Sequence, residues 1–207
     1  MVGTRQYPDE LSGSFPSPPT TAEDREDRTI EIRAPETFTG DALDDVVEMY
    51  TEFDPTDRAQ GIPPTGAERI RNWLETIGED SVNVVARHDG DVIAHAMLVP
   101  DTDDPSAIEH KSDIEWELAI FVLQAYQRAG IGTILLKNLL GHAIEVGIER
   151  VWLTVERWNN PAIALYERVG FESTGTESFE QEMAIRLEGD GSGAAEGTES
   201  GAADGDG

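Results

Sequence analysis

The sequence predicts an α/β (α+β) fold in which a mixed central β-sheet of about six to seven strands is flanked by about four helices. Three observations lead to this prediction. Segments with strand-like and helix-like hydrophobic spacing alternate along the chain, a turn dipeptide joins two strand-like runs, and a glycine-containing turn joins a strand-like run to a helix-like one. Strands that alternate with helices form mixed sheets whose faces the helices cover.

Side-chain spacing predicts the first strand and two helices. Residues 29–33 alternate apolar and polar side chains, as a half-buried strand does, and residues 41–53 repeat apolar side chains at helical intervals. The sequence Thr65-x-x-Glu68 is a capping box, so a second helix is expected to begin there and to end at Gly78. The proline-containing stretch between the two helices is expected to be a loop.

A hairpin and a series of alternating elements follow. Two β-rich runs, residues 82–88 and 92–99, surround the turn dipeptide Asp89-Gly90, which predicts the hairpin. An acidic loop is expected over residues 100–113. The remaining expected elements are a strand at 114–123, a helix at 131–146, a strand at 151–155, a helix at 161–169 closed by Gly170-Phe171, and a strand at about 180–187.

Both ends of the chain differ in composition from its middle. Residues 1–28 are rich in proline, serine, threonine and charged side chains, and we expect a disordered, flexible arm there. Residues 188–207 consist almost entirely of glycine, alanine, serine, threonine and acidic residues, which predicts a disordered acidic tail. A single folded domain is therefore expected over residues 29–187.

The charge balance is strongly acidic. The net charge is −27, and Lys111 and Lys137 are the only lysines among 15 basic residues. Such a charge opposes compaction at low salt, whereas the Debye length falls to about 3 Å at 1 M salt and relieves the repulsion. We interpret the composition as an adaptation to a salt-rich, halophile-like cytosol. It also argues against nucleic acid as a partner, because a basic stripe is missing from the sequence.

The chain contains no cysteine, which excludes disulfides, thiolate metal sites and a cysteine nucleophile. The four histidines lack the spacing of metal ligands, so no metal is expected. No apolar run approaches the roughly 20 residues that span a bilayer, and residues 1–17 lack the apolar core of a signal peptide. We therefore expect a cytoplasmic protein with no membrane partner.

The most informative local feature is the stretch Gln127-Arg128-Ala129-Gly130-Ile131-Gly132, called the glycine turn below. It lies between the expected strand at 114–123 and the expected helix at 131–146. The first N–H groups of a helix lack internal partners, and the helix dipole favours negative charge there. Because glycines have no Cβ atom, a phosphate can approach the main chain closely. The turn is a candidate anion site.

Two common nucleotide loops do not fit the glycine turn. A dinucleotide fingerprint needs a third glycine where Leu135 stands, and a P-loop needs a lysine where Thr133 follows the second glycine. Taken alone, the turn is equally compatible with a simple strand-to-helix connection in which the glycines serve geometry. The neighbouring sequence has to decide between these interpretations.

Together with a downstream segment, the glycine turn resembles the GNAT superfamily of acyl-CoA-dependent N-acyltransferases. The turn matches the family's Gln/Arg-x-x-Gly-x-Gly/Ala pattern, which holds the coenzyme A diphosphate, and the two motifs have the family's order and separation. The downstream matches are Asn159, Ala162, Leu165, Tyr166, Gly170 and Phe171. The resemblance is clear over residues 82–171 and looser over residues 29–77. It implies the GNAT fold and acetyl-CoA as the co-substrate.

The resemblance and the chemistry of acyl transfer imply a general base. The attacking amine must be neutral, yet a lysine-type amine has a pKa of about 10.4, and a nearby carboxylate can take its proton directly or through water. The family often places a glutamate on the strand before the glycine turn. Glu117 fits best, because it lies five residues before Val122, where the strand should splay, and Glu115 is the alternative. In so acidic a chain, either residue could simply face solvent.

The resemblance assigns the role of general acid to Tyr166, whose phenol would protonate the leaving thiolate. Without the motif, a helix-face aromatic that packs with its neighbours would be the simpler interpretation. The negative charge that develops on the acyl oxygen would meet a backbone N–H near Val122. Asn159 would fix the coenzyme or its own loop by hydrogen bonding.

The expected coenzyme-binding residues belong mostly to the glycine turn. They are Val122, Gln127, Arg128, Ala129, Gly130, Ile131, Gly132, Thr133 and Asn159. Coenzyme A is anionic and this protein repels it at long range, so local cations matter. Arg128 could pair with a phosphate oxygen, although composition alone makes a surface charge equally plausible.

The leading hypothesis is an N-acetyltransferase that transfers acetyl directly from acetyl-CoA to a primary amine of a protein or of a small molecule. The alternative is an acyl-CoA sensor or adaptor that binds the thioester without turnover. Residues 53–64 are expected to shape the acceptor side, but their sequence does not identify the amine. A homodimer is possible by analogy with relatives.

Overall fold

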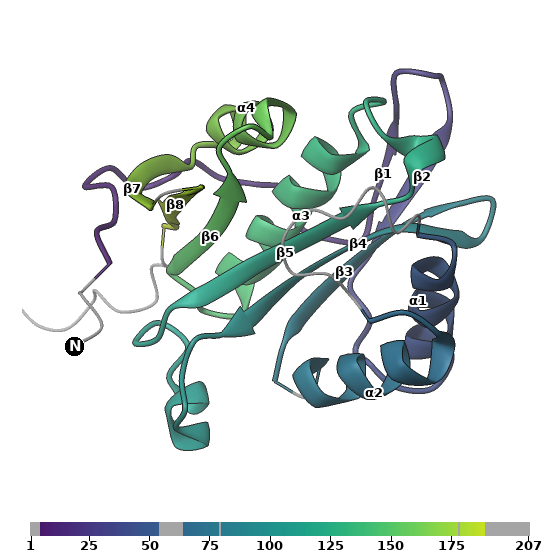
Figure 1. Cartoon of the computed structure of the whole chain (residues 1–207), viewed down its shortest axis with the longest axis horizontal. Coiled ribbons are helices and arrows are strands. Elements are labelled where there is room, and N and C mark those ends of the chain that lie inside the picture. Colours follow the sequence, from purple (N-terminus) through teal and green to yellow (C-terminus); the bar gives the residue numbers. More distant parts are fainter. Residues whose placement is uncertain (1–4, 54–63, 79, 178, 189–207) are drawn as a thin grey trace, which may run out of the picture.

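The computed structural model describes residues 5–53, 64–78, 80–177 and 179–188. In this part of the chain, eight strands form one mixed sheet in the order β1-β2-β3-β4-β5-β6-β8-β7 (Figure 1). The strands are β1 (Thr20–Glu23), β2 (Thr29–Arg33), β3 (Val82–His88), β4 (Asp91–Pro100), β5 (Trp116–Val122), β6 (Arg150–Glu156), β7 (Glu172–Glu177) and β8 (Glu180–Arg186). All neighbours are antiparallel except β5 and β6, which are parallel.

Helices cover both faces of the sheet. The α-helices are α1 (Asp41–Thr51), α2 (Ala67–Gly78), α3 (Ile131–Glu145) and α4 (Asn160–Val169). Short 3-10 helices, η2 (Pro105–Glu109) and η3 (Gln124–Tyr126), lie before and after β5. In Figure 1, α1 and α2 lie together on one side of the strands, and α3 crosses the other. No helix in the described ranges has both the length and the hydrophobicity to cross a membrane.

Two buried clusters correspond to the two faces. The larger cluster joins α3 and α4 to one face of the sheet, and Trp116, Leu135 and Phe171 are among its most buried members. The smaller cluster joins α1 and α2 to the opposite face through residues such as Tyr50 and Phe121. The alternation of side chains along β5 therefore sends successive residues into different cores.

The expected α/β architecture is confirmed, with eight strands where we predicted six to seven. The two strands without a sequence prediction are β1 and β7, which lie at the two edges of the sheet. The polar sequence of β7 contains Gly175 at a shift of its pairing register, so it lacks regular apolar alternation. The second helix begins at Ala67, within the predicted capping box of residues 65–68, and the main-chain carbonyl of Gly66 accepts from the amide of Ile70.

The prediction of a flexible arm over residues 1–28 is wrong for residues 5–28. This segment crosses α3, where a Cβ atom placed on Gly141 would lie 2.1 Å from the carbonyl oxygen of Pro16. The same segment contains β1, which pairs with β2, and the amide of Ser12 donates a hydrogen bond to the carbonyl of Arg186. Main-chain hydrogen bonds and close helix contact order a segment whose composition resembles that of a disordered one. Apart from Glu188, the predicted acidic tail lies outside the described residues.

Candidate active site

The centre of the sheet opens where its only parallel pair of strands separates. Strands β5 and β6 pair at two positions, Trp116 with Val151 and Glu117 with Trp152. Strand β4, in contrast, follows β5 over its whole length to Val122. The predicted splay of the strand before the glycine turn is therefore present in the structure, and it leaves a gap between β5 and β6.

Main-chain groups of β5 face this gap. The amide of Leu123 donates to the carbonyl of Ile93 at 3.0 Å, which fixes the side of the strand that pairs with β4. Because hydrogen-bonding direction alternates along an antiparallel strand, the N–H and C=O groups of Ile120 and Val122 point toward β6. The carbonyl of Val122 accepts a hydrogen bond from the side chain of Gln127 at 3.1 Å. An open peptide edge is thus available inside the sheet.

A cavity of about 560 Å³ lies at this opening. Its walls come from the end of β5, the glycine turn, the start of α3, and α4. The predicted site residues that line it are Val122, Gln127, Arg128, Gly130, Gly132, Thr133, Asn159 and Tyr166. The side chains of Ala129 and Ile131 are buried in the core instead, at 2% and 1% exposure, so only their main chains can contribute. Most of the predicted set is brought together at one cavity.

The glycine turn has the backbone geometry of an anion site. Gly130 is the N-cap of α3 and has a left-handed φ of 95°, and Arg128 is also left-handed at 63°. The carbonyl of Gly130 accepts from the amides of Thr133 and Ile134, so the helix closes its first turn there. The preceding amides, those of residues 131 and 132, are the first in the helix and have no intrahelical acceptor. The turn therefore combines free amides with the positive end of a helix dipole.

Tyr166 extends from α4 into the opening between the strands. Its side chain is largely buried and packs against Phe171, with ring centroids 5.8 Å apart. Burial raises the pKa of Tyr166 to about 12, so the phenol stays protonated at neutral pH. Among the described residues, no side chain or main-chain group forms a hydrogen bond with its hydroxyl. This hydroxyl can donate a proton to a ligand in the cavity.

A smaller cavity of about 100 Å³ adjoins the first and reaches Glu117. The two cavities share wall residues from β5 and α4, namely Ile120, Phe121, Asn159, Ala162 and Tyr166. Partial burial raises the pKa of Glu117, and the negative charge of Asp101 adds to the rise while Arg5 opposes it. A raised pKa makes this carboxylate a stronger base.

The structure separates the two candidate bases. Glu115 precedes β5, and its carboxylate forms an ion pair with Arg5, which also pairs with Glu182. The guanidinium of Arg5 therefore occupies this carboxylate, which leaves it less accessible to a ligand. Glu117, in contrast, lines a cavity beside Tyr166. The geometry therefore favours Glu117 over Glu115.

Asn159 supports the position of Tyr166. It is the N-cap of α4, and its side-chain oxygen accepts a hydrogen bond from the amide of Ala162 at 3.3 Å. Pro161 lies in the first turn of the helix, where its fixed φ suits helix initiation. The residue therefore holds its own loop, one of its two expected roles, while it also lines both cavities.

Sequence reasoning missed two arginines of the larger cavity. Arg25 and Arg168 line it together with Arg128, although the chain carries a net charge of −27. Arg168 lies within the downstream motif, so its proximity to Tyr166 could have indicated it. Arg25 lies in the segment that composition assigned to a flexible arm, and no local pattern marks it. Most of the expected acceptor loop, residues 54–63, lies outside the described residues; Phe53 lines the larger cavity.

Comparison with known proteins is consistent with this geometry. Residues 43–171 match the model of the acetyltransferase (GNAT) family. The chain is 32% identical over 96 residues to an uncharacterized N-acetyltransferase of Mycobacterium tuberculosis, covering 46% of this chain and 56% of that protein. It is 33% identical over 101 residues to the spermine/spermidine N(1)-acetyltransferase of Bacillus subtilis, covering 47% and 64%. The chain thus spans less than two thirds of these curated relatives.

Solved structures share the fold. The GNAT domain of an S. lividans protein superposes with a TM-score of 0.64 at 20% identity, covering 88% of this chain and all of that one. The ribosomal-protein-alanine N-acetyltransferase of Brucella melitensis gives a TM-score of 0.59 at 25% identity, covering 75% and 99%. The family model spans more than half of the sequence, and the glycine turn, the splayed strands and the downstream motif all lie within it. This chain belongs to the acetyltransferase (GNAT) family.

Proposed function

We propose that this protein is an acetyl-CoA-dependent N-acetyltransferase that transfers acetyl directly to a primary amine. The observation that carries the proposal is the pair of adjoining cavities between β5 and β6, which begin at the glycine turn and end at Glu117, with Tyr166 in the wall of both. A path of this kind suits a long thioester whose diphosphate lies at one end and whose acyl group lies near a proton acceptor.

The residues present suit the coenzyme. The free amides at the start of α3 and the guanidinium of Arg128 match its diphosphate. The outward N–H groups of Ile120 and Val122 and the C=O group of Ile120 can pair with an amide-containing chain as a neighbouring strand would. Acetyl-CoA would supply an activated acetyl group, and the main-chain N–H near Val122 would stabilise charge on the acyl oxygen.

Glu117 and Tyr166 divide the proton transfers. Glu117, whose pKa is raised, would accept the proton of the incoming ammonium directly or through water. Tyr166 would donate its proton to the departing sulfur. The burial that raises the pKa of the phenol also raises the pKa of a thiol in the same cavity. Proton transfer from Tyr166 to the thiolate is therefore less unfavourable than the solution pKa values imply. The absence of cysteine from the sequence agrees with direct transfer, with no cysteine-bound acetyl group.

A release assay tests the proposal. Purified protein in molar KCl would be mixed with acetyl-CoA and panels of small amines, lysine peptides, N-terminal peptides and aminoglycosides, and free CoA measured. We expect amine-dependent CoA release for at least one class, with the acetylated product identified by mass spectrometry. Calorimetry with acetyl-CoA runs in parallel. Binding without release would favour the non-catalytic sensor, and absence of both would refute the proposed function.

The cellular setting remains part of the proposal. We infer that the protein works in a salt-rich cytoplasm, because its acidic composition would destabilise it at low ionic strength. A melting temperature that rises between 0.1 M and 2 M KCl would support this inference. A homodimer stays a prediction, to be checked by light scattering in the same buffers.

A further inference from the structure

The hairpin formed by β1 and β2 touches the glycine turn. Its tip, residues 24–28, precedes the stretch that matches the family model, and one of its side chains, Arg25, lines the larger cavity. Arg25 approaches the cavity from a different segment than Arg128 and Arg168 do. Three guanidinium groups around one opening are notable in a chain with 42 acidic and 15 basic residues.

Arg25 is fixed directly to the glycine turn. Its main-chain amide donates to the carbonyl of Ala129 at 2.9 Å, and its guanidinium donates to the carbonyl of Arg128 at 3.5 Å. A Cβ atom on Gly130 would lie 3.7 Å from Nε of Arg25. The arginine side chain therefore runs alongside the turn whose amides open the helix.

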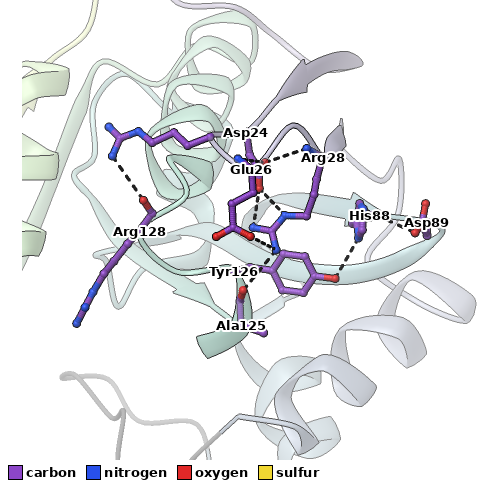
Figure 2. A network of polar contacts seen from close by, with 9 residues as sticks. Asp24, Glu26, Arg28, His88, Asp89, Ala125, Tyr126 and Arg128 are labelled. Atoms are coloured by element: carbon purple, nitrogen blue, oxygen red, sulfur yellow. Dashed lines mark hydrogen bonds and ion pairs between the residues drawn. The ribbon is translucent and has the colours of Figure 1, made fainter.

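A buried ion pair between Asp24 and Arg28 holds the tip in place (Figure 2). The side chain of Asp24 is fully buried and accepts hydrogen bonds from the amides of Glu26 and Arg28 at 2.8 and 3.0 Å. It also accepts from Nε of Arg28 at 2.7 Å. Because each of these donors belongs to the tip itself, Asp24 sets the conformation of the turn between the two strands.

Arg28 connects this ion pair to the segment before the glycine turn. Its guanidinium lies 4.5 Å from the ring centre of Tyr126 and donates to the carbonyl of Ala125 at 3.4 Å. The hydroxyl of Tyr126 forms a hydrogen bond with Nδ1 of His88 at 3.1 Å, so the ring is itself held in place. The tip therefore contacts residues 125 and 126 through Arg28 and residues 128 and 129 through Arg25.

We propose that Arg25 is a phosphate-binding residue of the coenzyme site and that Asp24 and Arg28 position it. The inference rests on the proposed function, because it needs a phosphate-bearing ligand in the larger cavity. A guanidinium binds phosphate oxygens through paired charge-assisted hydrogen bonds. In a protein whose overall field repels an anionic coenzyme, such a local cation has a large share in its affinity. The ligand group is either the diphosphate or the 3′-phosphate of coenzyme A.

Kinetics of Arg25→Ala test the inference. We expect KM for acetyl-CoA to rise about tenfold or more, as for loss of a hydrogen bond to a charged group, while kcat stays within about twofold. Arg33→Ala is the matched control, because Arg33 lies on the same hairpin, is half-exposed and pairs with Glu31 on its own strand. It should leave KM unchanged. Arg25→Lys keeps the charge without the planar fork and should recover part of the affinity.

Acetyl-dephospho-CoA distinguishes the two phosphates. If Arg25→Ala raises KM for this analogue as it does for acetyl-CoA, Arg25 binds the diphosphate. If the rise in KM disappears with the analogue, Arg25 binds the 3′-phosphate. If wild-type protein binds acetyl-CoA in calorimetry but Arg25→Ala has the same Kd, the inference is overturned while the proposed function survives. It is also overturned if affinity and melting temperature fall together and Arg25→Lys restores neither, which would indicate a structural arginine.

Discussion

Two buried tyrosines on opposite faces of the sheet show how one residue type serves two purposes. Tyr50 on α1 and Tyr166 on α4 are exposed by 4% and 9%, and burial raises the pKa of both. The hydroxyl of Tyr50 forms a hydrogen bond with Nδ1 of His95 at 3.0 Å. The hydroxyl of Tyr166 forms none with the described residues and lies at a cavity. Partnered hydroxyls stabilise a core, whereas an unpartnered one at a cavity is available to a ligand.

The network around Tyr50 is complete. The side-chain nitrogen of Asn83 donates to the carbonyl and hydroxyl of Ser81, so its oxygen faces Nε2 of His95 at 3.0 Å. Nε2 therefore carries the proton, and Nδ1 accepts from Tyr50. Phe38 stacks on the imidazole at 5.4 Å between ring centroids, and burial lowers the pKa of His95 to about 3. Each polar atom has a partner, and the imidazole is neutral.

The two regions meet at Phe121. This ring packs edge-on against Tyr50 with centroids 5.2 Å apart, and it also lines both cavities beside Tyr166. A rigid, satisfied core on one face thus supports a wall of the open site on the other. We therefore expect that removing the hydroxyl of Tyr166 lowers catalytic activity, whereas removing the hydroxyl of Tyr50 lowers stability.

The largest expected effect is that of Tyr166→Phe. We expect kcat to fall by about 100-fold or more, because the leaving thiolate loses its proton donor. The free energy of unfolding should change by less than about 0.5 kcal/mol, since no hydrogen bond to a described residue is lost. Steady-state kinetics and urea denaturation in molar KCl measure the two quantities. A variant with normal kcat, or one that is strongly destabilised, would break the contrast between the tyrosines.

Glu117→Gln is expected to lower kcat/KM by about 10- to 100-fold at neutral pH, because the ammonium loses its proton acceptor. The loss should shrink as the pH rises toward the pKa of the amine, where a neutral amine forms without help. In wild type, kcat/KM should fall as the pH drops through the raised pKa of Glu117, where the carboxylate becomes protonated. The pH profile of both proteins measures this.

Glu115→Gln is the matched control for this experiment, because it makes the same change two residues away in a carboxylate that Arg5 holds. Its effect on kcat/KM should stay within about threefold, the scale of a surface ion pair. The reverse ranking of the two variants would show that the base has been misassigned.

The sequence predicted local structure well and distant contacts poorly. The hairpin of β3 and β4, the glycine turn and the α4 segment each have a continuous pattern, so they were predicted near their observed positions. The place of Arg25 depends instead on a hydrogen bond to Ala129, about 100 positions along the chain. Nothing within residues 20–33 encodes that contact, and the polar composition around it resembles disorder. The same holds for Tyr50, His95 and Asn83, which come from three separate elements.

Tyr50→Phe sharpens the comparison from the stability side. Removing this hydroxyl leaves Nδ1 of His95 buried without a donor, which should cost about 1–3 kcal/mol of unfolding free energy. The packing of the ring against Phe121 is kept, so kcat should stay within about twofold of wild type. Urea denaturation followed by tryptophan fluorescence gives the first number. A stability equal to wild type would mean that the hydrogen bond contributes nothing beyond the burial of the ring.

The smallest expected effect is a change in the slope of stability against pH. His95 has a folded pKa of about 3 and an ordinary unfolded pKa of about 6.5, so the unfolded chain binds an extra proton between these values. Stability contributed by neutral burial is therefore present above pH 6.5 and is lost as the pH falls, by at most about 1.4 kcal/mol per pH unit. The His95→Gln variant has no imidazole to bind this proton on unfolding. The stability of the variant should therefore decline less steeply than that of wild type between pH 6 and 4.5. Since all the carboxylates are common to both proteins, the difference in slopes isolates the imidazole, and equal slopes would mean that His95 can be protonated in the folded state.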